Sequence, residues 1–375
     1  MTQAQPIVWC LLGKKAGDNT QVLALADELG WQCERKTILA RASEILVHLG
    51  HRATLSGIDI ARSSALQAPW PDLVISAGRR NEPVAQWIRA QSAGKTRLVH
   101  VGRPWAPLDQ WDLIVTTPQY FLPQQVNVHH NQMPLLRLPK DSLRAAGEDL
   151  LPQLESLPRP WVAVLMGGDS GKYVMTAEKG KRLGSLATDL AVAAEGSLLA
   201  TDSPRTPKEA GDAMQAELHE PNYCYRFHTR GTDGENNPYL GLLALADAFI
   251  VTGESMSMLA EACATGRPVF VFDVGDGDTP WWMLLHNYRV KPLSFHLGRV
   301  LGPRRMRRDI GRIQEALVGS DQVQWLDSQV VYQVAEQLKE ATHASPSQQA
   351  LSDSIAQREL AATADAVRQL LATSR

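Results

Sequence analysis

Short apolar runs recur along the chain, and each is followed by glycine or polar residues and then by a helical pattern. In the amino-terminal half the runs are residues 6–12, 72–76, 97–101 and 113–116, with a weaker one at 37–39. In the carboxyl-terminal half they are residues 161–166, 197–200, 223–227, 248–252 and 269–272. Such short apolar runs are typical of strands that are covered on both faces. Strands that alternate with helices predict an α/β fold with a parallel sheet in each half.

The alternation is clearest over residues 237–273, which read NPYLGLLALADAFIVTGESMSMLAEACATGRPVFVFD. Asn237 can cap a helix that Pro238 opens and that runs to about Asp247. The strand 248–252 then ends at Gly253, and a second helix is expected to about residue 264, with Ser255 as its cap. The pattern predicts helix, strand, turn, helix and strand, joined by a right-handed crossover.

The turn before this second helix predicts an anion-binding site. Free backbone N–H groups and the positive end of the helix dipole meet there, and Ser255 and Ser257 add hydroxyl donors. Glu261 shares a helix face with Ser257 and could accept two hydrogen bonds from a ribose diol. The alternative is an ordinary crossover, in which Ser255 is a cap and Glu261 is a solvated helix residue.

Two further loops follow strands in the amino-terminal half. After the first strand, Gly13 to Asn19 leads into a helix expected from about residue 20, and Lys14 in this loop could hold a phosphate. Asp18 could cap that helix or act as a base. Arg79 follows the strand 72–76 and suits a substrate phosphate or carboxylate. Solvated charges and a capping aspartate are the alternatives for these residues.

The carboxyl-terminal half repeats this arrangement at Gly167 and Gly168. The loop is not a Walker loop, because the spacing to Gly171-Lys172 is one residue short and Tyr173 stands where a Ser or Thr would meet magnesium. It could approach a ligand or form a tight turn. Thr201 and Arg205 stand at the end of the strand 197–200, beside this loop.

Length and composition limit the class of protein. A chain of 375 residues suits two domains, which we expect at residues 1–156 and 157–340, followed by a helix and tail at 341–375. A hydrophobic content of 44%, a charged content of 21% and a formal net charge of −2 indicate a soluble globular protein rather than a nucleic-acid binder. The four cysteines have no zinc-site spacing, so we expect no metal, no cofactor and reduced thiols.

The amino terminus carries no secretory pattern, so a cytoplasmic location is expected. A basic helix at residues 299–312, with Arg304, Arg305, Arg307 and Arg308, could lie on an anionic lipid surface such as an inner membrane. A solvated helix face is the alternative.

Several motifs carry a family resemblance. They are Asn237-Pro238-Tyr239, the residues 252–258 (TGESMSM), Glu261-Ala262, the residues 265–269 (TGRPV), the opening GKKAGDNTQ and the Gly167-Gly168 loop. The chain resembles the plant "elongated mitochondria" mitochondrial-fission family and its bacterial relatives, which are regarded as B-type glycosyltransferases. The resemblance implies two Rossmann-like domains that face each other across a cleft.

The resemblance also implies transfer of a sugar from a nucleotide-sugar donor to an acceptor, with a membrane or cell-envelope molecule as one option. It places the donor diphosphate on Gly167, Gly168, Ser255 and Ser257 and the ribose on Glu261, with Thr201, Arg205, Gly253, Glu254 and Met256 around them. It places the acceptor near Gly13, Lys14, Asn19 and Arg79, and leaves Asp18 as the candidate base.

Details of the resembled enzymes bear on mechanism. Retaining enzymes of this fold often carry two glutamates with seven residues between them. Glu254 and Glu261 have six between them, which favours inversion. The first glycine loop lacks the histidine that some relatives carry there. A nucleotide-sugar epimerase or hydrolase and a non-catalytic scaffold at a membrane surface are therefore the competing interpretations.

Overall fold

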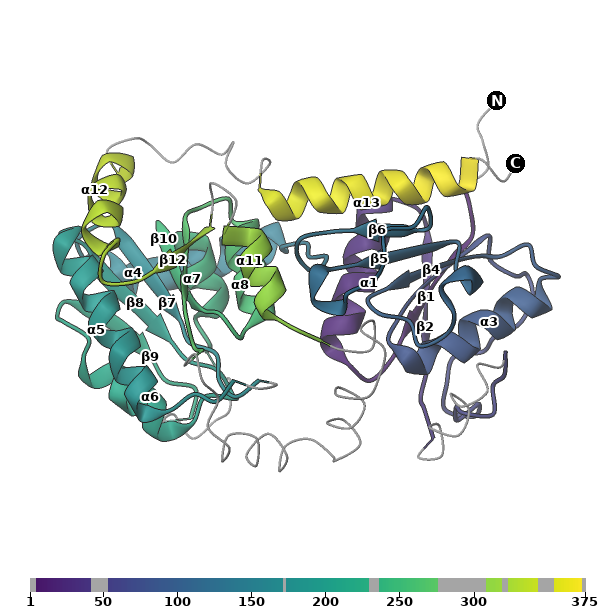
Figure 1. Ribbon diagram of the computed structural model, residues 1–375, viewed down its shortest axis with the longest axis horizontal. Coiled ribbons are helices and arrows are strands. Elements are labelled where there is room, and N and C mark those ends of the chain that lie inside the picture. Colours follow the sequence, from purple (N-terminus) through teal and green to yellow (C-terminus); the bar gives the residue numbers. More distant parts are fainter. Residues whose placement is uncertain are drawn as a thin grey trace. The chain divides into compact units, whose positions relative to one another are not determined.

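The computed structural model describes residues 5–41, 53–170, 173–228, 236–275, 308–318, 323–342 and 354–372. Its contacts divide the chain into two compact units. Unit 1 takes its described residues from Met1–Arg137, Leu297–Asp309 and Ala356–Arg375, and unit 2 takes them from Leu138–His296 and Ile310–Ile355. Each unit holds one parallel sheet covered by helices (Figure 1), so the predicted α/β class with two Rossmann-like domains is confirmed.

Unit 1 is built on a six-stranded parallel sheet in the order β2-β1-β3-β4-β5-β6. The strands are β1 (Val8–Leu12), β2 (Cys33–Thr37), β3 (Leu73–Ala77), β4 (Arg97–Val101), β5 (Leu113–Thr116) and β6 (Val128–His130). The helices are α1 (Ala16–Leu29), α3 (Glu82–Gln91) and α13 (Ile355–Ala372), with short 3₁₀ turns at Arg79–Asn81, Leu108–Gln110 and Pro118–Tyr120.

The carboxyl-terminal helix α13 completes the core of unit 1. Leu360, Ala364 and Val367 are fully buried in the same cluster as Leu25 of α1 and Ile75 of β3. In Figure 1, α13 lies along the sheet of unit 1. The helix expected at the end of the chain is therefore firmly packed and part of unit 1, whereas the sequence interpretation placed it in a separate segment at 341–375.

Unit 2 is built on a second six-stranded parallel sheet in the order β12-β11-β10-β7-β8-β9. The strands are β7 (Trp161–Leu165), β8 (Ser197–Thr201), β9 (Asn222–Tyr225), β10 (Ala248–Thr252), β11 (Val269–Phe272) and β12 (Val323–Leu326). The helices are α4 (Lys140–Leu154), α5 (Ala177–Ala193), α6 (Lys208–Ala216), α7 (Tyr239–Leu245), α8 (Met256–Ala264), α11 (Gly311–Val318) and α12 (Val331–Thr342).

Among the described residues, two hydrophobic clusters hold α4, α5, α6, α7 and α12 to the sheet of unit 2. The larger one joins α5 and α12 to the strands through residues such as Leu183, Leu338 and Phe270. The smaller one joins α4 to α7 through Leu150, Leu154 and Leu242. Helix α4 therefore belongs to unit 2, and the division of the chain falls at Arg137 rather than near Leu157, where the sequence interpretation placed it.

Each sheet contains one point at which the strand order reverses. In unit 1 it lies between β1 and β3, and in unit 2 between β7 and β10. Ligands of open parallel α/β sheets bind outside the carboxyl ends of the strands at such a point, because the connecting loops diverge there. The predicted loops at Gly13 and Gly167 follow β1 and β7, so both lie at a reversal.

The strand predictions at residues 97–101, 113–116, 248–252 and 269–272 match β4, β5, β10 and β11 residue for residue. The starts of two helices differ in part from the expectations. Helix α1 begins at Ala16 rather than near residue 20, with Lys15 at the cap position and no side-chain cap hydrogen bond, so Asp18 lies in the first helical turn and does not cap it. Ser255 stands at the cap position of α8, but its side chain makes no cap hydrogen bond.

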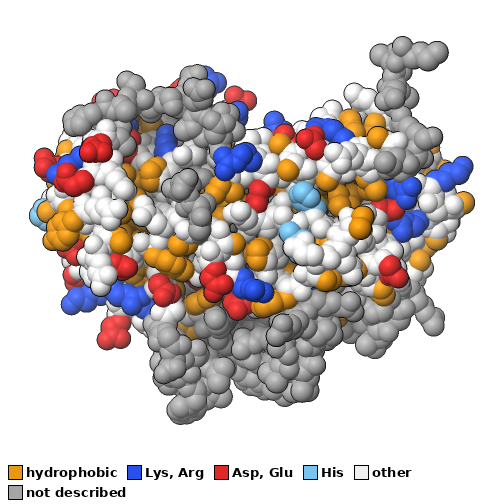
Figure 2. All heavy atoms as spheres, turned by 45° about the horizontal axis from the view of Figure 1, so that its top comes forward, with side chains coloured by type: hydrophobic (Ala, Val, Ile, Leu, Met, Phe, Trp, Pro, Cys, Tyr) orange, Lys and Arg blue, Asp and Glu red, His pale blue; other side chains and the backbone are white. Residues whose placement is uncertain are grey.

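Arg304, Arg305 and Arg307 of the predicted basic helix lie outside the described residues. On the face shown in Figure 2, acidic and basic side chains are interspersed, in keeping with the small net charge of the chain. Among the described helices, none combines the length and the apolar character that a membrane span requires.

Candidate functional site

The carboxyl edges of β7 and β10 meet in a tightly packed pair of turns. The N–H of Gly167 donates to Thr252 Oγ1 at 2.7 Å. A Cβ on Gly167 would lie 1.9 Å from Glu254 Oε1, and a Cβ on Gly168 would lie 2.1 Å from the carbonyl oxygen of Arg205. Only glycine fits at these two positions, so the loop lies directly against the turn after β10 at Gly167 and against the turn after β8 at Gly168.

The carboxyl group of Glu254 lies inside this pair of turns and is only 2% exposed. Its Oε1 accepts a hydrogen bond from the Thr252 hydroxyl at 3.2 Å, whereas its Oε2 has no partner among the residues that the structure describes. Burial raises the pKa of Glu254 to about 7, although the hydrogen bond from Thr252 and the charge of Arg205 act in the opposite direction. Near neutral pH the group can therefore be either a carboxylate or a hydrogen-bond donor.

Arg205 supplies a positive charge beside the first turn of α8. Its Nη1 donates to the carbonyl of Asp169 at 3.1 Å, and its Nη2 donates to Ser255 Oγ at 3.4 Å. Ser255 is 2% exposed, whereas Ser257, one position past Met256, is exposed. The amino terminus of α8 and this guanidinium together favour the binding of an anion beside the turn that joins β10 to α8.

Glu261 lies on α8 and is held by Tyr239 from the start of α7. The Tyr239 hydroxyl donates a hydrogen bond to Glu261 Oε2. Burial raises the pKa of Glu261, and the hydrogen bond from Tyr239 lowers it. Burial and the negative charge of Glu261 raise the pKa of Tyr239, so the phenol stays protonated and remains the donor.

A residue distant in sequence supports the turn after β10. The Gln314 side chain of α11 donates through Nε2 to the carbonyl of Gly253, and a Cβ on Gly253 would lie 2.5 Å from that nitrogen. Gln314 and Thr252 were not identified from the sequence. Each is polar and buried, but no local spacing connects Gln314 with a loop that lies 61 residues away.

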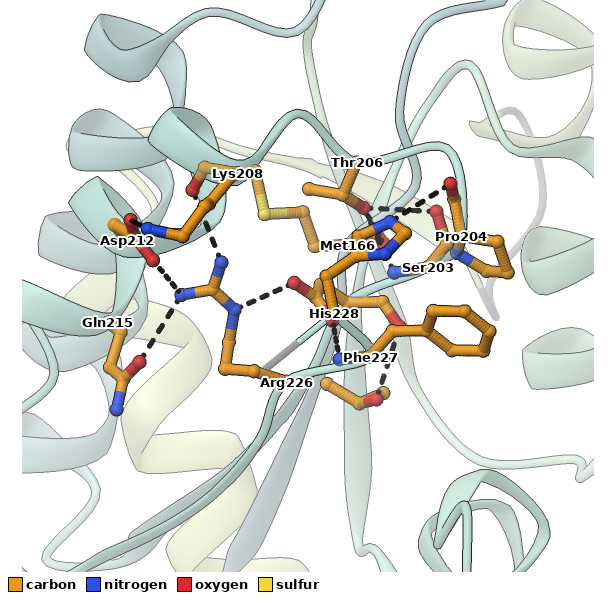
Figure 3. Close-up of polar contacts among 12 residues, drawn as sticks. Met166, Ser203, Pro204, Thr206, Lys208, Asp212, Gln215, Arg226, Phe227 and His228 are labelled. Atoms are coloured by element: carbon orange, nitrogen blue, oxygen red, sulfur yellow. Dashed lines mark hydrogen bonds and ion pairs between the residues drawn. The ribbon is translucent and has the colours of Figure 1, made fainter. Parts of the chain in front are cut away.

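The ends of β8 and β9 are organised by Arg226 (Figure 3). Its Nε donates to Asp202 Oδ2 at 2.7 Å, and its Nη1 contacts Asp212 Oδ1 at 2.9 Å and Gln215 Oε1 at 3.2 Å. Asp202 also accepts from the N–H of Phe227 at 2.6 Å. This network fixes the segments that follow both strands.

The turn after β8 reaches the candidate site. Thr201 is fully buried, and its hydroxyl points to the carbonyl of Asp202 at 3.3 Å, so it supports the turn from within. The ring of His228 lies over this turn, with its Nε2 3.1 Å from the carbonyl of Pro204 (Figure 3). Arg205 and His228 thus lie beyond the carboxyl ends of β8 and β9, respectively.

In unit 1, Asp18 reaches the reversal between β1 and β3. A Cβ on Gly78 would lie 2.6 Å from Asp18 Oδ2, and the φ of Gly78 is +72°, so only glycine leaves room for this carboxylate. Burial raises the pKa of Asp18, while Lys15 and Arg308 lower it. A carboxylate with a raised pKa at a sheet edge is a suitable proton acceptor.

The other residues expected at this edge have different surroundings. Asn19 closes the first loop on itself, because its Oδ1 accepts from the N–H of Gly13 at 2.9 Å and its Nδ2 donates to the Gly13 carbonyl at 2.8 Å. Lys14 is exposed. Arg79 lies over the ring of Trp105, with 4.8 Å from its guanidinium carbon to the ring centroid.

Several of the residues that were predicted to bind the nucleotide-sugar donor therefore lie next to one another in unit 2. They are Gly167, Gly168, Arg205, Gly253, Glu254 and Ser255. Gly171 and Lys172 lie outside the described residues. Within the parts of the chain that the structure describes, no three His, Cys, Asp or Glu side chains are grouped so that they could hold a metal ion.

Two curated proteins are similar to this chain. The mitochondrial fission protein ELM1 of Arabidopsis thaliana is 28% identical over 252 residues, which cover 61% of this chain and 57% of that protein. The chain thus spans little more than half of the plant protein. The uncharacterized protein RP120 of Rickettsia prowazekii (strain Madrid E) is 23% identical over 304 residues, covering 71% of this chain and 82% of that protein.

Solved structures with a similar arrangement include two enzymes. A UDP-GlcNAc 2-epimerase from Neisseria meningitidis, bound to UDP-GlcNAc, is 13% identical with a TM-score of 0.47, covering 98% of this chain and 99% of that chain. A UDP-glucosyltransferase from Polygonum tinctorium is 10% identical with a TM-score of 0.44, covering 99% of this chain and all of that chain.

A family model described as mitochondrial fission ELM1 matches residues 16–284. The matched segment contains the reversal points of both sheets, including Gly78 with Asp18 and the Gly167 loop with Glu254. The chain belongs to the mitochondrial fission ELM1 family.

Proposed function

We propose that the chain is a glycosyltransferase whose unit 2 binds a nucleotide-sugar donor. One observation carries the proposal. At the reversal between β7 and β10, the Gly167 loop, the amino terminus of α8 and the guanidinium of Arg205 lie next to one another. Backbone N–H groups, a helix dipole and an arginine together match a diphosphate.

The donor would lie along the first turns of α8. The diphosphate would meet the loop at Gly167 and Gly168, the hydroxyls of Ser255 and Ser257, and Arg205. The ribose would meet the carboxylate of Glu261, whose Oε2 is already oriented by Tyr239. Departure of the diphosphate would be promoted by these fixed donors, because they stabilise the charge that develops as the glycosidic bond breaks.

Glu254 has a defined part in this proposal. An ionised Glu254 would repel a diphosphate, whereas its protonated form could donate a hydrogen bond from Oε2. Because burial raises its pKa to about 7, the cost of protonating it near neutral pH is small. Diphosphate binding would therefore be accompanied by uptake of a proton at Glu254.

Unit 1 would bind the acceptor, as the family resemblance implies. Asp18 would remove a proton from the acceptor hydroxyl, since its raised pKa makes it a better base than an exposed aspartate. Gly78 provides the space that keeps this carboxylate at the sheet edge.

Calorimetric titration with UDP, GDP, CDP and TDP tests the donor site. We expect one of them to bind with a stoichiometry of one, and Arg205→Gln to weaken that binding about tenfold or more, since a hydrogen bond to a charged group contributes about 1.5–3 kcal/mol. Arg144→Gln is the matched control, because Arg144 is an exposed arginine on α4 of the same unit. Equal affinity in the Arg205 and Arg144 variants would contradict the proposal.

One observation favours a second function, that of a nucleotide-sugar epimerase or hydrolase. Glu254 places a group that can gain or lose a proton near neutral pH inside the donor site itself. Incubation with isotope-labelled nucleotide sugars and no acceptor separates the two functions. Epimerised or hydrolysed sugar that disappears in Glu254→Gln would support the second function, and an unchanged donor would support transfer.

A further inference from the structure

Unit 1 contains a pocket at the carboxyl edge of β4 and β5. It measures about 260 Å³ including its open mouth. Its polar lining comes from Gln21, Thr116, Thr117, Gln119, Tyr120 and Asn131. The enclosed part of the pocket is only about 20 Å³, room for roughly one water-sized group, so no more than one small end of a ligand can enter it.

Two buried donors in or beside this pocket have no hydrogen-bond partner among the described residues. Thr116 is 1% exposed and lines the pocket, yet its Oγ1 is unpartnered. The Nη1 of Arg103, which follows β4, is also buried and unpartnered. Buried polar groups of native proteins are almost always hydrogen-bonded, so two such donors at one edge indicate an acceptor that the described residues do not supply.

Two arginines give this edge a positive charge. The guanidinium carbon of Arg103 lies 5.8 Å from the centroid of the Tyr120 ring, and Arg308 Nε donates to Gln119 Oε1 at 2.7 Å. Burial lowers the pKa of Arg103 and the nearby charge of Arg308 lowers it further, whereas Tyr120 and Glu82 act in the opposite direction. The two cations are therefore close enough to repel each other.

The neighbouring carboxylates do not compensate this charge by ion pairing. Both oxygens of Glu82 accept hydrogen bonds from the N–H groups of Trp105 and Ala106, at 2.8 to 3.0 Å. Asp18 has Lys15 as its strongest charged neighbour and Arg308 as a weaker one. Within the described residues, Arg103 and Arg308 form no ion pair shorter than 4 Å, so a bound anion would relieve their repulsion.

We propose that this pocket binds the phosphate of a phosphomonoester. The phosphate would accept hydrogen bonds from Arg103, Arg308 and the hydroxyl of Thr116, and the remainder of the ligand would extend through the open mouth. A phosphate offers more acceptor oxygens than a carboxylate, which matches two forked guanidinium groups and a hydroxyl. The site belongs to unit 1 and does not depend on nucleotide binding in unit 2.

Titration of the full chain with inorganic phosphate and with sn-glycerol 3-phosphate, followed through the amide signals of Gly102 and Thr117 in nuclear magnetic resonance spectra, tests the site. We expect saturable shifts that weaken at least fivefold in Arg103→Gln and in Thr116→Val, with partial recovery in Arg103→Lys. Arg62→Gln, which removes an exposed arginine of unit 1, should have no effect. Should Arg103→Gln fail to fold, the isosteric Thr116→Val variant still decides the question.

A further variant distinguishes this site from the proposed donor site. If Arg205→Gln abolishes the phosphate response while Arg103→Gln and Thr116→Val preserve it, the anion binds in unit 2 and the proposal is overturned. A response that none of these variants changes also overturns it. Vesicles of phosphatidylcholine with and without phosphatidic acid separate the two sources of the phosphate. Binding to phosphatidic acid that is lost in Arg103→Gln identifies a lipid, and a response to glycerol 3-phosphate alone identifies a soluble ligand.

Discussion

The hydroxyl of Tyr239 donates a hydrogen bond to the carboxylate of Glu261, 22 residues further along the chain. The contact joins the start of α7 to the middle of α8 and fixes one oxygen of a carboxylate that would otherwise rotate freely. A ribose diol bound to Glu261 would meet an oriented acceptor, which lowers the entropic cost of binding.

Removal of the hydrogen bond between Tyr239 and Glu261 should reduce the preference for a ligand with both ribose hydroxyls over its 2′-deoxy analogue. We expect Tyr239→Phe to weaken binding of the preferred nucleoside diphosphate by about 3- to 10-fold, the effect of about one hydrogen bond. Binding of the 2′-deoxy analogue should change less, because that ligand presents only one of the two hydroxyls. Calorimetry with both ligands on wild type, Tyr239→Phe and Glu261→Gln measures the coupling. Equal losses for the two ligands would contradict a role in orienting Glu261.

Gly167 should not tolerate a side chain. In Gly167→Ala the new methyl group would have to displace the Glu254 carboxyl group, whose Oε1 lies 1.9 Å from the position of the added carbon. We expect a loss of roughly 1–3 kcal/mol in the free energy of unfolding, as for other overpacked sites. Gly17→Ala is the control, since nothing lies within 4 Å of its added carbon and helix α1 should gain roughly 0.4–1 kcal/mol. Urea denaturation measures both, and a neutral Gly167→Ala would show that the two turns can separate.

Glu254 should make the stability of the protein depend on pH. Its pKa rises from 4.5 in the unfolded chain to about 7 in the folded protein, so the folded state binds more protons between these values. The stability contributed by the protonated form is present below pH 4.5 and is lost as pH rises through 7, by up to about 3 kcal/mol. Glu254→Gln should therefore exceed wild type in stability at pH 8.5 and lose that advantage at pH 4.

Denaturation curves of both proteins at several pH values provide the comparison for Glu254. Burial also raises the pKa of Glu82 to about 7, but Glu82 is present in both proteins, so its contribution cancels in the difference. A difference in stability that stays constant with pH would exclude titration of Glu254 in this range.

Arg226 should contribute strongly to the stability of the folded protein, through the segments that follow β8 and β9. In Arg226→Gln the carboxylate of Asp202, whose side chain is 1% exposed, would lose its ion-pair partner at 2.7 Å. Breaking a buried pair in this way costs roughly 3–5 kcal/mol. Lys208→Gln, which removes the exposed partner of Asp212 in the same network, should leave stability close to that of wild type, because exposed pairs contribute little. Thermal unfolding of the two variants gives the comparison, and similar melting temperatures would contradict it.

Sequence reasoning identified much of the fold because local patterns specify it. The strand at residues 248–252 is continuously apolar and ends at a glycine, and the structure places β10 at the same residues. Asn237 was expected as a cap, but Pro238 stands at the cap position of α7, and Asn237 Oδ1 accepts from the N–H of Tyr239 at 3.0 Å from one residue before it. The start of α1 was misplaced because Lys15 is not a recognisable cap residue and Gly17 is an unfavourable helix former.

The candidate donor residues were named from the sequence, but their partners were not. The sequence by itself determined the two alternating α/β halves, the glycine loops and the helix start at Met256, since periodicity and turn chemistry are local properties. Only the tertiary structure decided that α13 belongs to unit 1, that Gln314 supports the turn at Gly253, and that Arg103 and Thr116 share one edge. Those relationships depend on strand order and on packing between segments distant in sequence, which no local pattern encodes.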